Sequence, residues 1–135
     1  MPTKIFVNIA VKDLAKAMEF FAKLGFKFNP QFTDSNAACM IVTDDIYFML
    51  LTQETMRRFT SREISDPRKA TEAIHALSVD SREDVDEMVR RAIAAGGTPN
   101  NEPIDHGFMY QHGFQDLDGH IFELFYMDPS FVKPH

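Results

Sequence analysis

The sequence predicts an α+β fold in which a β-α-β-β-β module occurs twice in one chain of 135 residues. Three observations lead to this prediction. Short runs rich in Ile, Val, Phe and Met have the alternation or the length of strands. Two longer segments carry apolar residues at helical spacing, and each is followed by glycine. The order of elements in the first half returns in the second, with the helix-ending Gly25 and Gly96 separated by 96 − 25 = 71 residues.

The first module, about residues 1–52, is predicted to begin with a strand at residues 4–11. Asp13 is the expected N-cap of the helix that follows, and Gly25 suits the left-handed residue that ends it. The apolar stripe of this helix consists of Leu14, Ala17, Met18, Phe21 and Leu24. The remaining three strands are predicted at residues 26–32, with an interruption at Pro30, at 37–42 and at 46–52, where the last two are joined by a short turn.

Residues 53–73 are polar and charged and are interpreted as a connector with room for a short helix. The second module, about residues 74–128, starts with a strand in the segment AIHALSV. Ser81 and Asp84 resemble a capping box at the start of a helix that ends at Gly96. A weak strand near residues 98–104 and a hairpin around Asp118-Gly119 complete the module, and a short C-terminal tail follows.

One such module exposes an apolar sheet face, so we expect the two copies to pack into a single domain, residues 1–135, whose curved mixed sheet surrounds a shared cavity. A concavity of this kind is a natural ligand site. Thirteen phenylalanines and eight methionines suit either a well-filled core or an adaptable apolar pocket.

The composition limits the classes of partner. A net charge of −6 without a clustered Lys/Arg face argues against nucleic-acid binding. No stretch approaches the ~18 uncharged apolar residues of a membrane span. The N-terminus lacks the apolar core of a signal peptide, so we expect a cytoplasmic protein without a membrane partner. The one cysteine, Cys39, excludes an internal disulfide, and its apolar neighbours predict an inert, buried thiol.

Glu123 does not fit its surroundings. It lies in the segment HIFELFY, which otherwise has the pattern of a buried strand. An ionised carboxylate among apolar side chains costs free energy unless a cation or hydrogen-bond donors meet it. A bound metal, a ligand and a polar group elsewhere in the chain all satisfy this requirement, and the three alternatives stay open.

Two further motifs near Glu123 point to no site. The spacing of His106, His112 and His120 matches no common zinc pattern. The segment DLDG, residues 116–119, echoes a calcium loop but lacks the further acidic ligands of an EF-hand. His120 is expected to be solvated because it follows a turn.

The segments VKDLAKAMEFFAKLGF and DLDGHIFELFY, together with the duplicated module, resemble the vicinal oxygen chelate superfamily. That superfamily includes glyoxalase I, bleomycin and fosfomycin resistance proteins and extradiol dioxygenases. The resemblance covers nearly the whole chain, and FVNIAVKDL with NEPIDHGFMYQHGFQDLDGH is similar to a subgroup of predicted lactoylglutathione lyases. It implies the glyoxalase/bleomycin resistance fold and a homodimer, in which modules are often exchanged between subunits.

Metal-dependent members of the superfamily hold a divalent cation through one residue on the first and one on the last strand of each module. In this chain the resemblance places these positions at Phe6 and Met49, and at Ile74 and Glu123. One carboxylate does not hold such an ion against water, so we expect no metal cofactor. Because strand side chains alternate between faces, His75 should point away from Ile74, toward the helices, unless a bulge changes the register.

Glu123 is the candidate catalytic residue, and eight residues are candidates for ligand binding around it: Phe6, Asn8, Met49, Ile74, Ser78, Tyr110, His112 and Tyr126. Asn8 or a tyrosine is expected to hydrogen-bond Glu123. Two classes of function stay open. The first is binding of a small, partly apolar molecule without a metal, as in bleomycin resistance. The second is a lactoylglutathione lyase-like enzyme, or another lyase or isomerase, with Glu123 as base and a divalent metal.

Overall fold

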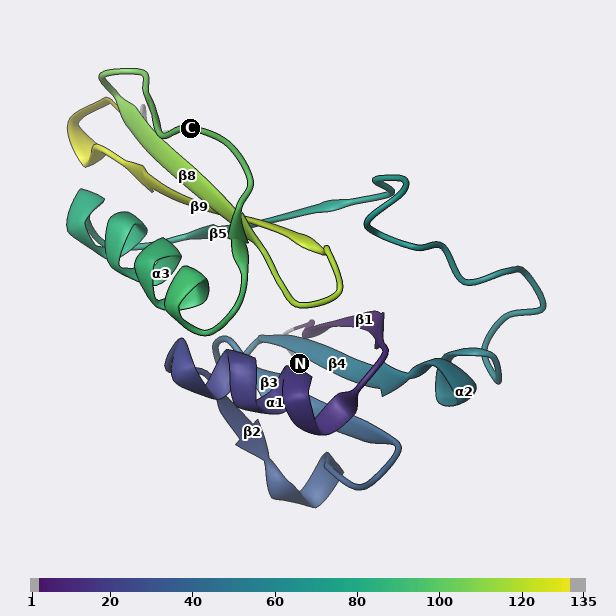
Figure 1. Cartoon of the computed structure of the whole chain (residues 1–135). Helices are drawn as coiled ribbons and strands as arrows, with labels where there is room; N and C mark the ends of the chain where they lie inside the picture. The colour runs from purple at the N-terminus through teal and green to yellow at the C-terminus, as the bar shows by residue number, and fades with distance from the viewer. Residues whose placement is uncertain (1–2, 132–135) are drawn as a thin grey trace. The chain divides into compact units, whose positions relative to one another are not determined.

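The protein consists of two compact units, one up to residue 65 and one from residue 66 onward, in a computed structural model that describes residues 3–131. The unit boundary falls inside the predicted connector. The last residues of the predicted C-terminal tail, 132–135, lie outside the described part of the chain. Each unit contains one mixed sheet and one long helix, which confirms the predicted α+β class (Figure 1).

The first unit follows the predicted order of elements. Its sheet has the strand order β1-β4-β3-β2, with β1 parallel to β4 and the other neighbours antiparallel. The elements are β1 (Ile5–Val11), α1 (Leu14–Lys23), β2 (Lys27–Asn29), a 3-10 turn η1 (Pro30–Phe32), β3 (Ala37–Ile41), β4 (Ile46–Thr52) and α2 (Gln53–Met56).

Local sequence signals explain the boundaries of these elements. The Asp13 side chain accepts a hydrogen bond from the backbone N–H of Lys16, 3.0 Å away, and so caps α1. Gly25 follows the helix with a φ of 103°, which glycine adopts without strain. Pro30 ends β2 because its ring nitrogen has no hydrogen to donate to a neighbouring strand.

The core of the first unit lies between α1 and one face of the sheet. Phe20, Phe21, Phe48 and Leu50 are among its buried side chains. Cys39 is also buried, and burial raises the pKa of its thiol. A buried thiol with a raised pKa holds little of the reactive thiolate, in agreement with the predicted inert cysteine.

The second unit repeats the arrangement. Its sheet has the strand order β5-β9-β8-β6, with β5 parallel to β9 and β7 also paired with β8. The elements are β5 (Ile74–Ser78), α3 (Arg82–Ala94), β6 (Thr98–Pro99), β7 (Ile104–Asp105), β8 (Met109–Gln115), β9 (Ile121–Met127) and a 3-10 turn η2 (Pro129–Phe131).

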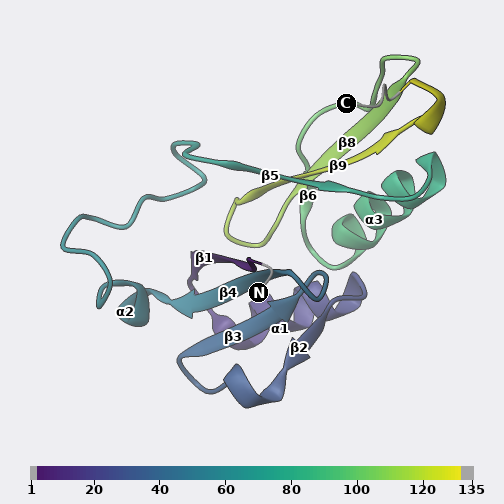
Figure 2. The ribbon, with the colours of Figure 1, turned by 180° about the vertical axis from the view of Figure 1, so that it is seen from behind.

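Helix α3 covers one face of this second sheet (Figures 1 and 2). The Ser81 hydroxyl accepts a hydrogen bond from the backbone N–H of Asp84, 3.0 Å away, as the predicted capping box requires. Val85 and Val89 of α3 are buried, and so are Phe114 and Phe122 of the sheet. The opposite face of the sheet carries no helix of the residues described between 66 and 131. Among the described residues, no helix has both the length and the apolar character that crossing a membrane requires.

Candidate functional site

The pairing of the strands places Glu123 on the face of the second sheet that α3 does not cover. Glu123 is paired with Ala76 of β5 on one side and with Gly113 of β8 on the other. Its sequence neighbours Phe122 and Leu124 are buried on the opposite face. Because side chains alternate along a strand, Glu123 points away from the core that α3 covers.

The two oxygens of the Glu123 carboxylate have different surroundings. Oε1 accepts hydrogen bonds from the side-chain amides of Asn100 and Asn101, at 3.1 and 3.2 Å. Oε2 is buried and has no hydrogen-bond partner among the residues that the structure describes. A buried polar oxygen without a donor is unusual in folded proteins and calls for a partner that the described residues do not supply.

Neighbouring polar groups hold the two asparagines in place. The Asn100 Oδ1 accepts a hydrogen bond from Gln115 Nε2 at 3.1 Å, so the amide nitrogen of Asn100 is the end that faces Glu123. The backbone N–H of Asn100 donates to the Gly113 carbonyl at 3.0 Å. His112 Nε2 lies 2.9 Å from the Asn101 carbonyl, which can only accept, so this nitrogen carries the hydrogen.

Gly113 provides the space for the carboxylate. A Cβ atom at this position would lie 2.6 Å from the Glu123 Cδ and Oε1 atoms and 2.8 Å from Oε2. These distances are far shorter than normal contacts, so the carboxyl group lies directly against the backbone of β8. The missing side chain of Gly113 therefore leaves the space in which the carboxyl group lies.

Five of the predicted ligand-binding residues lie on one face of each sheet, two of them in the second unit and three in the first. In the second unit, Ile74 and Ser78 each lie two residues from Ala76, the strand partner of Glu123, so they share the face of Glu123. In the first unit, Phe6, Asn8 and Met49 share one face, since Asn8 is paired with Met49 and Phe6 lies two residues from Asn8. The Asn8 amide donates to the Phe6 carbonyl at 3.1 Å. The hydrogen bonds described for Glu123 come from Asn100 and Asn101, where Asn8 or a tyrosine was expected.

Tyr110, His112 and Tyr126 were predicted as ligand-binding candidates around Glu123, but the structure places their side chains on the opposite face of the sheet. Gly113 is the β8 residue paired with Glu123. Tyr110, His112 and Tyr126 each lie an odd number of residues from one member of this pair, so their side chains point to the other face, toward α3. The Tyr110 hydroxyl donates to Asp86 of α3 at 2.6 Å, which with burial raises the pKa of Tyr110 to about 12. His112 still contributes indirectly, because it bonds the backbone of Asn101.

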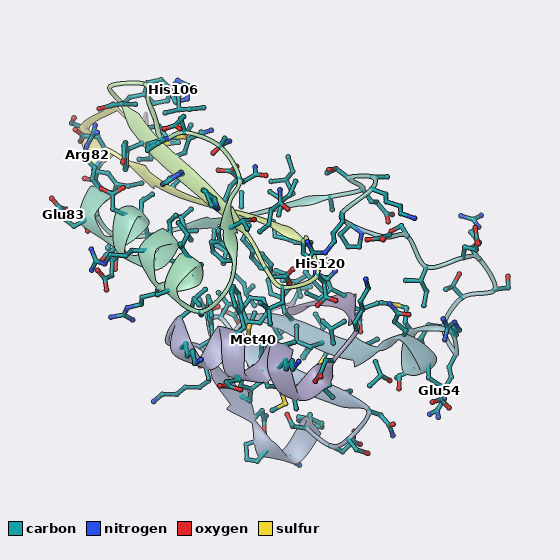
Figure 3. The ribbon with its side chains drawn as sticks, in the orientation of Figure 1. Met40, Glu54, Arg82, Glu83, His106 and His120 are labelled. Carbon is teal, nitrogen blue, oxygen red and sulfur yellow. The ribbon has the colours of Figure 1, made fainter. Side chains whose placement is uncertain are left out.

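Arg82, at the start of α3 (Figure 3), links this helix to residues 105–107 beside β8. Its guanidinium donates to Asp105 at 2.8 Å and to the Gly107 carbonyl at 3.1 Å, and it lies over the Tyr110 ring at 5.4 Å. Tyr110 therefore belongs to a structural contact between the helix and the sheet.

Sequence reasoning missed Asn100 and Asn101, the two residues that contact Glu123. Both follow β6 at the edge of the sheet, in a polar segment without periodicity. The adjacent asparagines in TPNNEPI are an ordinary loop signal, and nothing in the segment indicates that both amides turn toward β9.

His75 lies on the face opposite Glu123, as the predicted register requires. It pairs with Phe122 in a continuous parallel ladder, and the two rings are 5.2 Å apart. Burial lowers the pKa of His75, and the nearby His120 lowers it further, although Asp116 acts in the opposite direction. A histidine in this position favours the neutral form.

The expectation that His120 is solvated is wrong. Its Nδ1 lies 2.8 Å from Asp116 Oδ2, and the two side chains are only 10% and 2% exposed. Ligand-type atoms of Asp116, Asp118 and His120 lie within 4.8 Å of one another. Asp116 Oδ1 already accepts from the backbone N–H groups of Asp118 and His120, at 3.0 and 2.8 Å. These hydrogen bonds stabilise the turn between β8 and β9, and this turn brings the three side chains together.

The residues at the four positions that the resemblance assigns to metal ligands do not fit a divalent cation. Phe6 and Ile74 have no donor atom, and Met49 offers only a thioether sulfur, which suits soft metals. Glu123 already accepts two hydrogen bonds at Oε1, and the amides beside it present N–H groups, which repel a cation. Coordination by hard oxygen and nitrogen ligands requires more donors than these positions supply.

Solved structures similar to this chain share its fold. Hypothetical protein SA1046 from S. aureus is 28% identical, with a TM-score of 0.78 over 93% of this chain and 95% of that chain. A glyoxalase/bleomycin resistance protein/dioxygenase family enzyme from Burkholderia phytofirmans is 23% identical, with a TM-score of 0.76 over 90% and 96%. The fosfomycin resistance protein FosX from Listeria monocytogenes is 20% identical, with a TM-score of 0.69 over 96% and 97%.

No curated protein matches the sequence. The sequence profile of the Glyoxalase/Bleomycin resistance protein/Dioxygenase superfamily matches residues 5–124, which include most of both units as well as Glu123. The protein therefore belongs to the glyoxalase/bleomycin resistance protein/dioxygenase superfamily.

Proposed function

We propose that this protein binds a small, partly apolar molecule on the Glu123 face of its second unit, without a metal ion. The observation that carries the proposal is the Glu123 Oε2 atom, which is buried without a hydrogen-bond partner among the described residues. Leaving a charged oxygen unpaired costs free energy, and a ligand that supplies a donor removes this cost.

The surroundings of Glu123 support an apolar body for the ligand. Ile121 and Phe125 flank it on β9 and are half-buried, and Ile74 on β5 is 58% exposed. Ile121 and Phe125 share the face of Glu123, because each lies two residues from it on β9. Ile74 shares this face because it is paired with Ile121. A polar anchor within an apolar surface is typical of small-molecule sites.

Thermal stability measurements test this proposal. Purified protein, stripped of metal with a chelator, is heated with a panel of small aromatic and aliphatic compounds that carry one polar group. A ligand at ten times its dissociation constant stabilises the fold by about 1.4 kcal/mol, which raises the melting temperature by roughly 3–5 °C. We expect such shifts in the wild type and in Glu63→Gln, which removes an exposed carboxylate, and smaller shifts in Glu123→Ala.

The same preparation tests the enzymatic alternative, in which Glu123 acts as a base beside a divalent metal. Nickel or zinc is added together with a hemithioacetal substrate, and product formation is followed. Stoichiometric metal uptake with turnover that Glu123→Ala abolishes would defeat the binding proposal and favour a lyase. Ligand-induced stabilisation without turnover supports it.

A further inference from the structure

We infer that the ligand is a small amine: a protonated nitrogen on an aromatic or aliphatic body, bound with an N–H group directed at Glu123 Oε2. This inference rests on the proposed function and adds the charge of the ligand to it.

Glu123 is the one ionisable strand residue on its face of the second sheet in the described part of the chain. The other strand residues on this face are Ile74, Ala76, Ser78, Thr98, Ile104, Met109, Gln111, Gly113, Gln115, Ile121, Phe125 and Met127. None of them is a lysine or arginine. An anionic ligand therefore meets a negative charge and no counter-charge among these side chains, whereas a cation meets its opposite charge.

The hydrogen bonds of the carboxylate restrict the ligand to a donor. Asn100 and Asn101 both donate to Oε1, so the amides do not compete for Oε2. Oε2 is buried against the backbone at Gly113 and can only accept when the group is ionised. An ammonium group supplies both a donor and a positive charge, and such charge-assisted bonds are about twice as strong as neutral ones.

Asn100 and Asn101 act in this scheme as positioning residues. Gln115 fixes the orientation of the Asn100 amide, and His112 holds the backbone of Asn101. With Oε1 held by both amides, the carboxylate cannot turn freely to offer either oxygen. Of the two carboxylate oxygens, Oε2 alone is left without a donor among the described residues, which favours a ligand with a single donor group at one end.

Three probes with a phenyl ring on a short chain test the inference: 2-phenylethylamine, 2-phenylethanol and 3-phenylpropanoate. Isothermal titration at neutral pH measures each dissociation constant on the whole chain. We expect the amine to bind about tenfold more tightly than the alcohol. The positive charge on the donor strengthens its hydrogen bond by roughly the free energy that corresponds to a tenfold change in dissociation constant. The carboxylate should bind more weakly than the alcohol.

Two variants assign the preference to Glu123. Glu123→Gln keeps the shape and removes the charge, so the amine and alcohol should then bind within about twofold of each other. Gly113→Ala keeps the charge but moves the carboxylate, and it should reduce the preference as well. Glu63→Gln, with the same loss of charge at an exposed position, should keep the full preference.

The outcomes separate the inference from the proposed function. Equal or tighter binding of the alcohol or the carboxylate overturns the amine inference and leaves small-molecule binding intact. An amine preference that survives in Glu123→Gln also overturns it, because the charge then acts from elsewhere. Absence of binding by all three probes at millimolar concentration, together with no hit in the thermal panel, overturns the proposed function itself.

Discussion

Replacing Gly113 by alanine should destabilise the protein through Glu123 and not through the backbone. The backbone of Gly113 does not have a positive φ, so alanine can adopt it. The new Cβ would lie 2.6 Å from Glu123 Cδ and Oε1, and these atoms belong to the end of a flexible side chain. The carboxylate must therefore move and lose its bonds to Asn100 and Asn101.

The size of the effect follows from those two bonds. Hydrogen bonds to charged groups contribute about 1.5–3 kcal/mol each when buried. Glu123 is half-buried and Asn101 is exposed, so solvent replaces part of the loss. We expect Gly113→Ala to lower the free energy of unfolding by about 2 kcal/mol, which shifts a urea midpoint down by roughly 1 M.

A double-mutant cycle isolates the contribution of the carboxylate. In a Glu123→Ala background the added methyl group meets no carboxylate, and Gly113→Ala should be neutral or stabilise by up to about 1 kcal/mol. Urea unfolding followed by circular dichroism gives all four free energies. Equal destabilisation by Gly113→Ala in both backgrounds would refute the placement of Glu123 against β8.

Three further predictions concern titratable groups away from Glu123. The pKa of His75 is lowered, so its neutral form is favoured in the folded state. The contribution of His75 to the free energy of unfolding should therefore be complete above about pH 6.5 and fall as the pH drops further. In thermal melts, His75→Phe should lose part of this acid sensitivity. Tyr110, with a pKa of about 12 against an ordinary 10.0, stabilises the fold fully below pH 10 and loses that contribution between the two values. In Asp86→Asn, titration by ultraviolet absorbance should move the pKa of Tyr110 back toward 10.0. Cys39 should react with a thiol reagent much more slowly in the native protein than in urea, and equal rates would show that it is accessible.

Local signals explain why most of the fold could be predicted. Asp13 and Ser81 cap the two long helices where expected, and Gly25 and Gly96 follow the ends of these helices with positive φ. Such signals act over a few residues, so the chain does not need its tertiary contacts to reveal them. The interruption at Pro30 is local in the same way.

The candidate site could be predicted only in part. Glu123 is visible in the sequence because an acid interrupts an apolar run, and its face follows from the alternation of β9. Tyr110 and Tyr126 were predicted to lie around Glu123 but point to the other face of the sheet, because a shift of one residue reverses the face of a strand residue. Asn100 and Asn101 were missed because their amides reach Glu123 across β8 from 23 and 22 residues away.

The sequence by itself therefore determined the α+β class, the repeated module, the helix boundaries and the presence of one acid in an apolar strand. Only the tertiary structure decided which groups meet that acid: two asparagine amides at one oxygen, a glycine beneath the carboxyl group, and a second oxygen without a donor among the described residues. The physical reason is the range of the interactions. Caps, turns and periodicity depend on neighbours in the chain, whereas hydrogen bonds between side chains of different strands depend on register, which a single residue can reverse.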